Sequence, residues 1–183
     1  MGRLEVICGP MFSGKSEELL RRLRRADIAK KKHKLFKPAC DDRYSSTEVV
    51  SHSGDKRGCV TVDLDREEYI FKKIAYPPDL EIVAFDEVQF FSEYVIGVID
   101  YLVDSGVRVI VAGLDMDSEG YPFGPMPSLM ARAEEVLKLT AVCQTCGNPA
   151  THTHRKSKRG RQVLVGAADI YEARCREHWY KST

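Results

Sequence analysis

A glycine-rich string near the amino terminus constrains the fold of this 183-residue chain more than any other feature. Residues 9–16 read Gly-Pro-Met-Phe-Ser-Gly-Lys-Ser, which satisfies the pattern G-x-x-x-x-G-K-[ST] in full. An apolar, β-rich run over residues 3–8 precedes it, and residues 16–32 after it have leucines and an alanine at helical spacing. This order of strand, turn and helix predicts a loop that binds phosphate through backbone N–H groups and the amino end of a helix.

The residue types in this loop suit a nucleoside triphosphate with its metal ion. Glycines let the backbone curl around an anion. Lys15 would place its ammonium group on the β- and γ-phosphates, and the Ser16 hydroxyl is a ligand for Mg²⁺. We therefore predict that ATP and Mg²⁺ are bound here, by Gly9, Pro10, Met11, Phe12, Ser13, Gly14, Lys15 and Ser16.

Two acidic residues, Asp86 and Glu87, directly follow the apolar run 81–85. A carboxylate at the carboxyl end of a buried parallel strand lies beside the ligand crevice of an open α/β sheet. We expect Asp86 to hold Mg²⁺, and Glu87 to act as a general base on a nucleophilic oxygen. By themselves these residues would more simply be two solvated acids at the end of a strand, but the complete phosphate loop favours the functional interpretation.

Apolar runs alternate with helical patterns along the first 140 residues, which predicts an α/β fold of the P-loop NTPase (RecA-like) type with a mainly parallel sheet. We expect strands over 3–8, 34–37, 81–85, 107–112 and 135–140, and helices over 16–32, 67–75, 91–105 and 128–134. Residues 41–58 are expected to form a long loop or a weak hairpin, and 115–127 a loop. The composition changes near residue 141, so we divide the chain into residues 1–140 and a C-terminal module, 141–183.

That module carries two pairs of metal-binding residue types. Cys143-Gln-Thr-Cys146 and Cys175-Arg-Glu-His178 each place two ligands on a tight turn, as tetrahedral Zn²⁺ requires. Four protein ligands leave no open position, so a structural zinc in a ribbon-like module is expected. The alternative is a redox pair at Cys143 and Cys146 with a surface histidine at 178.

Composition narrows the class of partner. The chain is 43% hydrophobic with a net charge of +1, so no overall basic field favours nucleic acid. The basic strip 152–161 could bind nucleic acid, but it has few aromatic residues for base stacking, and we interpret it as a solvated loop. There is no run of eighteen apolar residues and no export signal, so we expect a cytoplasmic protein that binds no membrane.

Taken together, these motifs resemble the cellular-type (type II) thymidine kinases over nearly the whole chain. The string at 9–16 is that family's form of the phosphate loop, and Asp86-Glu-Val-Gln-Phe90 resembles its second signature. The string 41–45, Asp-Asp-Arg-Tyr-Ser, resembles its substrate-contact loop. Gly-Ala-Ala-Asp-Ile-Tyr at 166–171 resembles its nucleoside-holding segment.

The resemblance implies an activity, transfer of phosphate from ATP to the 5′-hydroxyl of thymidine, for nucleotide salvage and DNA synthesis. It implies Mg²⁺, a structural zinc, a homotetramer and feedback inhibition by dTTP. Glu87 would be the base and Arg43 would stabilise the transferring phosphoryl group, while Val88 and Gln89 would extend the nucleotide site. The nucleoside would contact Met11, Asp41, Phe90, Leu114, Phe123, Thr153, Leu164, Gly166 and Tyr171, under a flap formed by residues 150–166.

Three features depart from the family pattern. His178 stands where animal members have cysteine, and Ser118 where many members have an aromatic residue. The chain ends at Thr183 without the long tail of animal enzymes, which suggests a bacterial-type member.

Two other activities fit the same motifs. Glu87 could activate water in a P-loop NTPase, or the chain could be an ATPase carrying a nucleic-acid-binding zinc ribbon. Turnover of ATP that depends on added nucleoside would separate the kinase from both.

Overall fold

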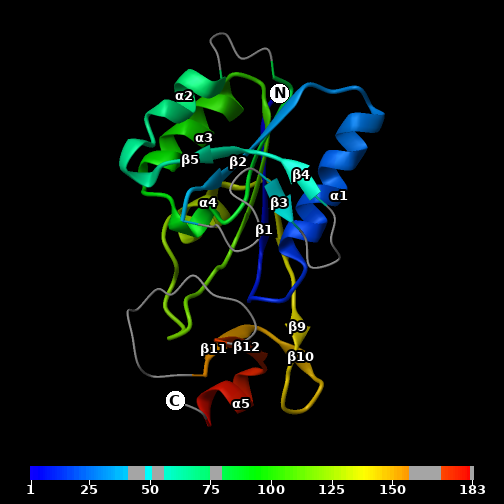
Figure 1. The fold of residues 1–183 in the computed structure, drawn as a ribbon, viewed down its shortest axis with the longest axis vertical. Coiled ribbons are helices and arrows are strands. Elements are labelled where there is room, and N and C mark those ends of the chain that lie inside the picture. Colours follow the sequence, from blue (N-terminus) through cyan, green and yellow to red (C-terminus); the bar gives the residue numbers. More distant parts are fainter. Residues whose placement is uncertain (41–47, 51–55, 75–79, 157–169, 182–183) are drawn as a thin grey trace.

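The computed structural model describes residues 1–40, 48–50, 56–74, 80–156 and 170–181. Its centre is a six-stranded sheet in the order β5-β2-β6-β7-β1-β8, with every neighbouring pair parallel (Figure 1). The strands are β1 (Arg3–Cys8), β2 (His33–Pro38), β5 (Val60–Val62), β6 (Ile82–Phe85), β7 (Arg108–Gly113) and β8 (Glu135–Lys138). The predicted α/β class with a parallel sheet is confirmed.

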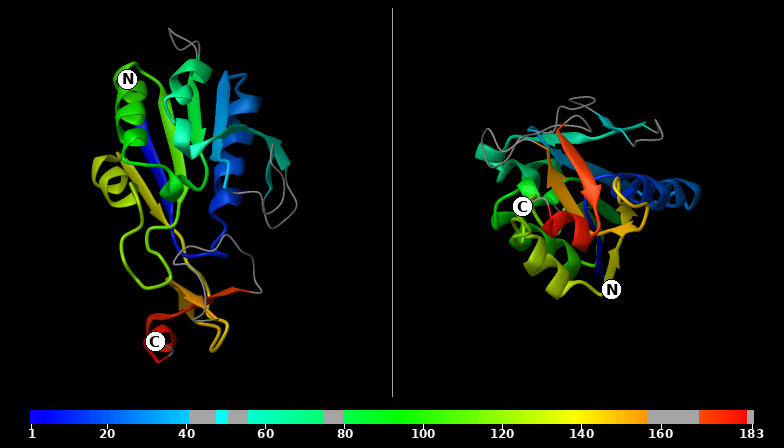
Figure 2. Two further views of the ribbon diagram at one scale, coloured as in Figure 1. Left: turned by 60° about the vertical axis from the view of Figure 1, so that its left-hand side comes forward. Right: turned by 90° about the horizontal axis from the view of Figure 1, so that it is seen from below.

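Helices cover both faces of this sheet because its central strands are apolar on both sides (Figure 2). The helix α1 (Lys15–Ile28) packs on one face, where its Leu19 and Leu23 join Ala84 of β6 in one buried cluster. The opposite face is covered by α2 (Tyr69–Ile74), α3 (Tyr94–Asp104) and α4 (Met126–Arg132), which share a second cluster with Phe85. Two short 3₁₀ helices, η1 (Leu64–Arg66) and η2 (Val88–Phe90), follow β5 and β6.

Several element boundaries differ from those expected. The helix α1 ends at Ile28 rather than near residue 32, because Lys30 takes a left-handed backbone conformation with φ of 55°. The helix α3 begins three residues late, at Tyr94, whose N–H bonds the Ser92 hydroxyl. The helix α4 begins two residues early, at Met126. The edge strand β5 was not among the expected strands. Of the two structures expected for residues 41–58, the weak hairpin is the one found, since β3 (Glu48–Val50) pairs antiparallel with β4 (Lys56–Gly58).

The C-terminal module, here described residues 141–156 and 170–181, lies beyond the carboxyl ends of the strands, at the bottom of Figure 1. It contains β9 (Ala141–Val142), β10 (Pro149–Ala150), β11 (His152–Arg155), β12 (Tyr171–Arg174) and α5 (Arg176–Tyr180). The expected solvated loop over 152–161 is therefore wrong in its first part, since β11 pairs with β12 and His152 and Thr153 are buried. Residues 157–161 lie outside the described residues.

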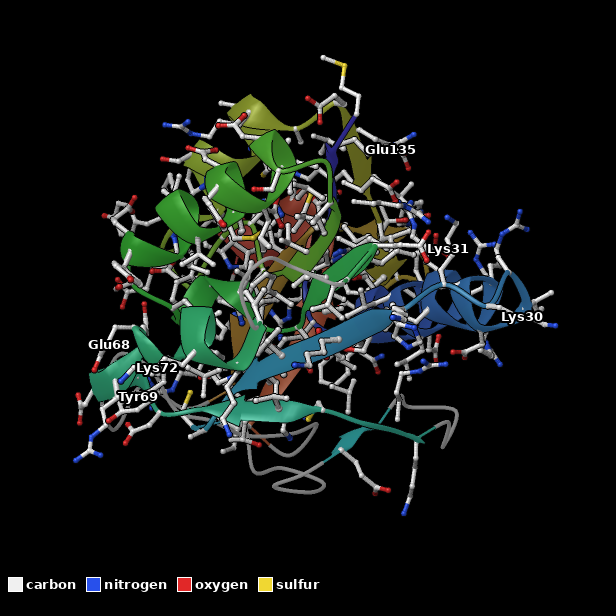
Figure 3. The ribbon with its side chains drawn as sticks, turned by 90° about the horizontal axis from the view of Figure 1, so that it is seen from above. Lys30, Lys31, Glu68, Tyr69, Lys72 and Glu135 are labelled. Atoms are coloured by element: carbon white, nitrogen blue, oxygen red, sulfur yellow. The ribbon has the colours of Figure 1, made fainter. Side chains whose placement is uncertain are left out.

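The opposite end of the molecule carries exposed charges. Figure 3 looks onto this end and shows Lys30 and Lys31 after α1, Glu135 at the start of β8, and Lys72 on α2. The Lys72 ammonium group lies 4.4 Å from the centre of the Tyr69 ring, a cation–π contact on the outer side of α2. Among the described residues, no helix has the length and apolar character that a membrane span requires.

Candidate active site and metal centre

The phosphate loop connects β1 to α1 by a backbone path that needs glycine at both ends. Gly9 has φ of 141°, and a Cβ added there would lie 2.4 Å from the carbonyl oxygen of Leu139. Gly14 has φ of 82° and caps α1, whose first hydrogen bond runs from the Glu18 N–H to the Gly14 carbonyl at 2.9 Å. The predicted strand, glycine turn and helix are confirmed, and the amino end of α1 faces the loop as phosphate binding requires.

Lys15 lies across this loop. Its Nζ donates to the Pro10 carbonyl at 2.7 Å, and Ser13 Oγ donates to the same oxygen at 2.8 Å. Lys15 is only 9% exposed, so its charge is largely shielded from water. A cation held over a glycine loop at a helix amino terminus suits a triphosphate.

Ser16 and Asp86 meet as a Mg²⁺ site requires. Asp86 follows β6 and is buried, and Ser16 Oγ lies 3.1 Å from its Oδ2. A hydroxyl and a carboxylate so close together, beside the phosphate loop, form an oxygen donor set that fits Mg²⁺. Ser16 and Asp86 are 70 residues apart in the sequence, and the fold brings their side chains together.

Glu87 is held in an unusual backbone conformation. Its φ and ψ are 51° and 41°, in the left-handed region, which costs a non-glycine residue about 1–3 kcal/mol. Gln89 braces the carboxylate, because Gln89 Nε2 donates to Glu87 Oε2 at 2.5 Å and Gln89 Oε1 accepts from the Leu114 N–H at 3.0 Å. Gln89, expected as part of the nucleotide site, thus connects Glu87 to the end of β7.

The expected nucleoside contacts come from several elements. Phe90 of η2 packs edge-to-face against Phe123 with ring centres 5.6 Å apart, and Leu114 is buried just after β7. Thr153 of β11 reaches the phosphate loop, where its Oγ1 accepts from the Met11 N–H at 3.0 Å. Tyr171 is buried in β12. The other expected residues, Asp41, Arg43, Leu164 and Gly166, lie outside the described residues.

An ion pair that sequence reasoning missed joins a buried carboxylate, Asp115, to the half-exposed Lys138. Lys138 Nζ, at the end of β8, is 2.6 Å from Oδ2 of Asp115, which follows β7. No local sequence pattern connects the two residues. Burial, together with the charge of Asp115, raises the pKa of the neighbouring Cys8 thiol to about 11. Cys8 therefore stays protonated at neutral pH and offers no nucleophile.

The four predicted metal ligands converge. One ligand atom from each of Cys143, Cys146, Cys175 and His178 lies within 4.8 Å of all the others. Cys146 Sγ and Cys175 Sγ are 3.8 Å apart, and His178 Nδ1 is 3.9 Å from Cys143 Sγ and 3.1 Å from Cys175 Sγ. Tetrahedral Zn²⁺ places such atoms about 3.5–3.8 Å apart.

One thiol of this cluster, that of Cys143, has its pKa shifted towards the form that binds a metal. Burial raises the pKa of Cys143, but backbone N–H groups of Cys175, Thr145 and Cys146 outweigh it and lower the pKa to about 6. A thiolate is the form that binds zinc. The donor set therefore fits a structural Zn²⁺, and the predicted convergence of the four residues is confirmed.

A separate surface cavity of about 250 Å³ lies between β5 and α2, lined by residues that include Val62, Arg66, Tyr69 and Lys73. None of its lining residues belongs to the phosphate loop, the 86–90 segment or the metal cluster. It is not part of the candidate active site.

A phosphate loop after the first strand of a parallel sheet, with Ser16 against Asp86, defines a P-loop protein that binds a nucleoside triphosphate. A family model described as thymidine kinase matches residues 2–179, so the chain belongs to the thymidine kinase family. Enzymes of this family are ATP-dependent phosphotransferases. The chain is also similar to a solved structure described as a DNA replication initiation factor, with 13% identity and a TM-score of 0.46, over 75% of this chain and 40% of that one.

Proposed function

We propose that this protein transfers the γ-phosphate of ATP to the 5′-hydroxyl of thymidine, and of deoxyuridine, in nucleotide salvage for DNA synthesis. Family membership supports the activity. The observation that carries the mechanism is the contact between Ser16 and Asp86, because it brings Glu87, the next residue, to the phosphate-loop side of the sheet. A candidate base thus lies in the same cluster as the candidate triphosphate site.

The nucleotide end of the site is assigned to the phosphate loop and the 86–89 segment. Lys15 and the loop N–H groups would bind the triphosphate, with Ser16 and Asp86 as the Mg²⁺ residues and Val88 and Gln89 beside them. Mg²⁺ bound there would neutralise charge on the phosphate oxygens. Gln89 would also fix the Glu87 carboxylate through the hydrogen bond described above.

Glu87 is assigned as the general base. It would take the proton of the 5′-hydroxyl while that oxygen forms a bond to the γ-phosphorus. The bond from the γ-phosphorus to the bridging oxygen breaks, and ADP leaves with the electron pair. Lys15 would stabilise charge on the transferring group, and so would Arg43 by its match to the family motif.

The nucleoside end of the site is assigned to residues on both sides of the junction between residues 1–140 and the C-terminal module. Met11, Phe90, Leu114, Phe123 and Tyr171 would line the base, and Asp41, Thr153, Leu164 and Gly166 would contact sugar or base. The described part of the flap, β11, already meets the phosphate loop at Met11. The structural zinc would hold this module, residues 141–183, in shape.

Family membership also motivates two further proposals, a homotetramer and inhibition by dTTP. Light scattering on the purified protein measures the first: a mass near four times 20.7 kDa is expected, and a monomer mass contradicts it. Adding dTTP to the kinase assay measures the second, and an unchanged rate contradicts it.

The test of the proposed function is ATP turnover against a panel of nucleosides at fixed Mg²⁺. Thymidine and deoxyuridine should stimulate ADP release, while deoxycytidine and purine deoxynucleosides should not. An ATPase would release ADP at the same rate without nucleoside, and a zinc-ribbon ATPase would respond to added nucleic acid instead. Burial in β11 removes His152 of the basic strip from the surface that such an ATPase would use.

A further inference from the structure

The loop that follows β7 is held from the C-terminal module by one indole ring. Trp179 of α5 is buried, and its Nε1 donates to the Ser118 carbonyl at 3.3 Å. The six-membered part of the ring lies against Gly120, where an added Cβ would be 2.8 Å from Cη2. Gly120 also has φ of 84°, so this position favours glycine twice over.

The indole is itself fixed from the other side. Its ring stacks on the ring of His152 with centres 4.8 Å apart and 29° between planes. The backbone N–H of Trp179 donates to the Cys175 carbonyl at 2.9 Å, so the residue is anchored beside the metal cluster. Trp179 therefore connects β11 and α5 to a loop of the nucleotide-binding part.

That loop is closed on itself, so its tip and its end move together. Met116 and Pro122 form a β-bridge. Between them, the Asp117 carbonyl accepts from the Gly120 N–H, and the Asp117 carboxylate accepts from two further backbone N–H groups, those of residues 119 and 121. The Phe123 N–H donates to the Asp115 carbonyl at 3.2 Å, which closes the loop just before the Phe123 ring reaches Phe90. A shift at Ser118 and Gly120 would therefore be transmitted to Phe123.

We propose that Trp179 is a positioning residue for the nucleoside: by holding the 115–123 loop, it sets the Phe123 ring against Phe90. This inference rests on the proposed function, in which those two rings line the base. Lys15, Ser16 and Asp86 do not touch Trp179 or this loop in the contacts described above. The consequence is a selective effect on nucleoside binding, with ATP binding and the chemical step unchanged.

Kinetics of three variants test this assignment. Trp179→Ala should raise KM for thymidine about 10- to 100-fold while kcat and KM for ATP stay within about twofold. Trp179→Phe keeps a stacking ring and should recover most of the affinity. Lys181→Ala removes an exposed side chain just after the same helix, and it should match the wild type. One metal per chain in each variant shows that the module is intact. An unchanged KM for thymidine in Trp179→Ala, or an equal rise in KM for ATP, would overturn the proposal.

A second measurement needs no substitution, because Trp179 is the only tryptophan of the chain. Titration of the wild-type protein with thymidine should change the tryptophan emission with saturation, and titration with ATP alone should leave it nearly constant. If the wild type phosphorylates thymidine but its emission does not respond to thymidine, the positioning role is wrong and the proposed function stands. If the wild type shows no thymidine-dependent turnover, the proposed function fails instead.

Discussion

The backbone N–H of Met11, in the phosphate loop, donates to the side-chain hydroxyl oxygen of Thr153 at 3.0 Å. The two residues are 142 positions apart, one after β1 and the other in β11 of the C-terminal module. The loop assigned to ATP and the module assigned to the nucleoside therefore share a hydrogen bond. A change at this contact should be felt at both substrates.

Thr153→Val should weaken the enzyme at this junction. Valine has nearly the same shape but no acceptor, so the Met11 N–H loses its partner, at a cost of about 1–3 kcal/mol. We expect kcat/KM for thymidine to fall about 5- to 100-fold, measured in a steady-state assay. Thr153→Ser keeps the oxygen and should stay close to the wild type. Equal kcat/KM in Thr153→Val and wild type would show that the bond contributes nothing to catalysis.

Glu87→Gln should abolish most phosphate transfer while thymidine still binds. Glutamine can still accept the hydrogen bond from Gln89, but it is a far weaker base. General-base assistance is worth about 10²- to 10⁴-fold in rate, so kcat should drop by that range. Calorimetry should give a thymidine Kd close to that of the wild type. Glu93→Gln, at an exposed carboxylate nearby, is the matched control, and near-normal kcat in Glu87→Gln removes Glu87 from the mechanism.

Zinc removal should affect the two ends of the site unequally. The folding free energy of a small zinc module comes largely from its metal, whereas the main sheet has two buried apolar clusters of its own. After chelation, or in the Cys143→Ser variant, the protein should therefore no longer bind thymidine but should keep part of its affinity for a non-hydrolysable ATP analogue. Elemental analysis should find one zinc per chain in the wild type and in Cys59→Ser, whose cysteine is outside the cluster. A metal-free protein with full activity would contradict this assignment.

Glu18 should contribute to stability above about pH 4.5 and lose that contribution in acid. The hydrogen bond from Arg21, which outweighs partial burial, and the bond from Arg22 lower the Glu18 pKa from 4.5 to about 2. Since the unfolded chain binds this proton first, stabilisation is complete above pH 4.5 and disappears as the pH falls to about 2.

Denaturant unfolding of wild type and Glu18→Gln across this pH window measures the effect. The wild type should be more stable by about 1–2 kcal/mol at pH 7, and the difference should shrink towards pH 2. Zinc release in acid affects both proteins alike, so only their difference is compared. A difference that is constant with pH would contradict the assignment. Glu68→Gln, at an exposed carboxylate on another part of the surface, should show no such trend.

Local patterns were sufficient for the strand, loop and helix around residues 3–28, and for the metal cluster. In both places the chemistry depends on residues at fixed short spacing, such as Gly14-Lys15-Ser16 and Cys175 with His178. The parallel sheet could be predicted from continuous apolar runs such as 81–85, because such a run is typical of a strand that is buried on both faces. Strand β5, over Val60–Val62, is only three residues long and lacks any periodicity that could reveal it.

Contacts between distant segments could not be predicted in this way. The positive φ at Glu87 and the hydrogen bonds of Gln89 depend on where β7 ends. The Asp115–Lys138 ion pair joins the segment just after β7 to the end of β8. The contact of Trp179 with Gly120 had two local signs, a single tryptophan beside the metal ligand His178 and a glycine in a loop. Neither sign names its partner, because tertiary packing alone brings them together.

Parallel quantification of ADP and the phosphorylated nucleoside, with thymidine and with 5′-deoxythymidine, tests the proposed function most directly. The analogue keeps the base and most of the sugar but lacks the hydroxyl from which Glu87 would take a proton. With Mg²⁺ and ATP, thymidine should give ADP and thymidine 5′-monophosphate in equal amounts, and 5′-deoxythymidine should give neither while competing with thymidine. ADP release that is the same with thymidine, with the analogue and without nucleoside would contradict a thymidine kinase and identify an ATPase.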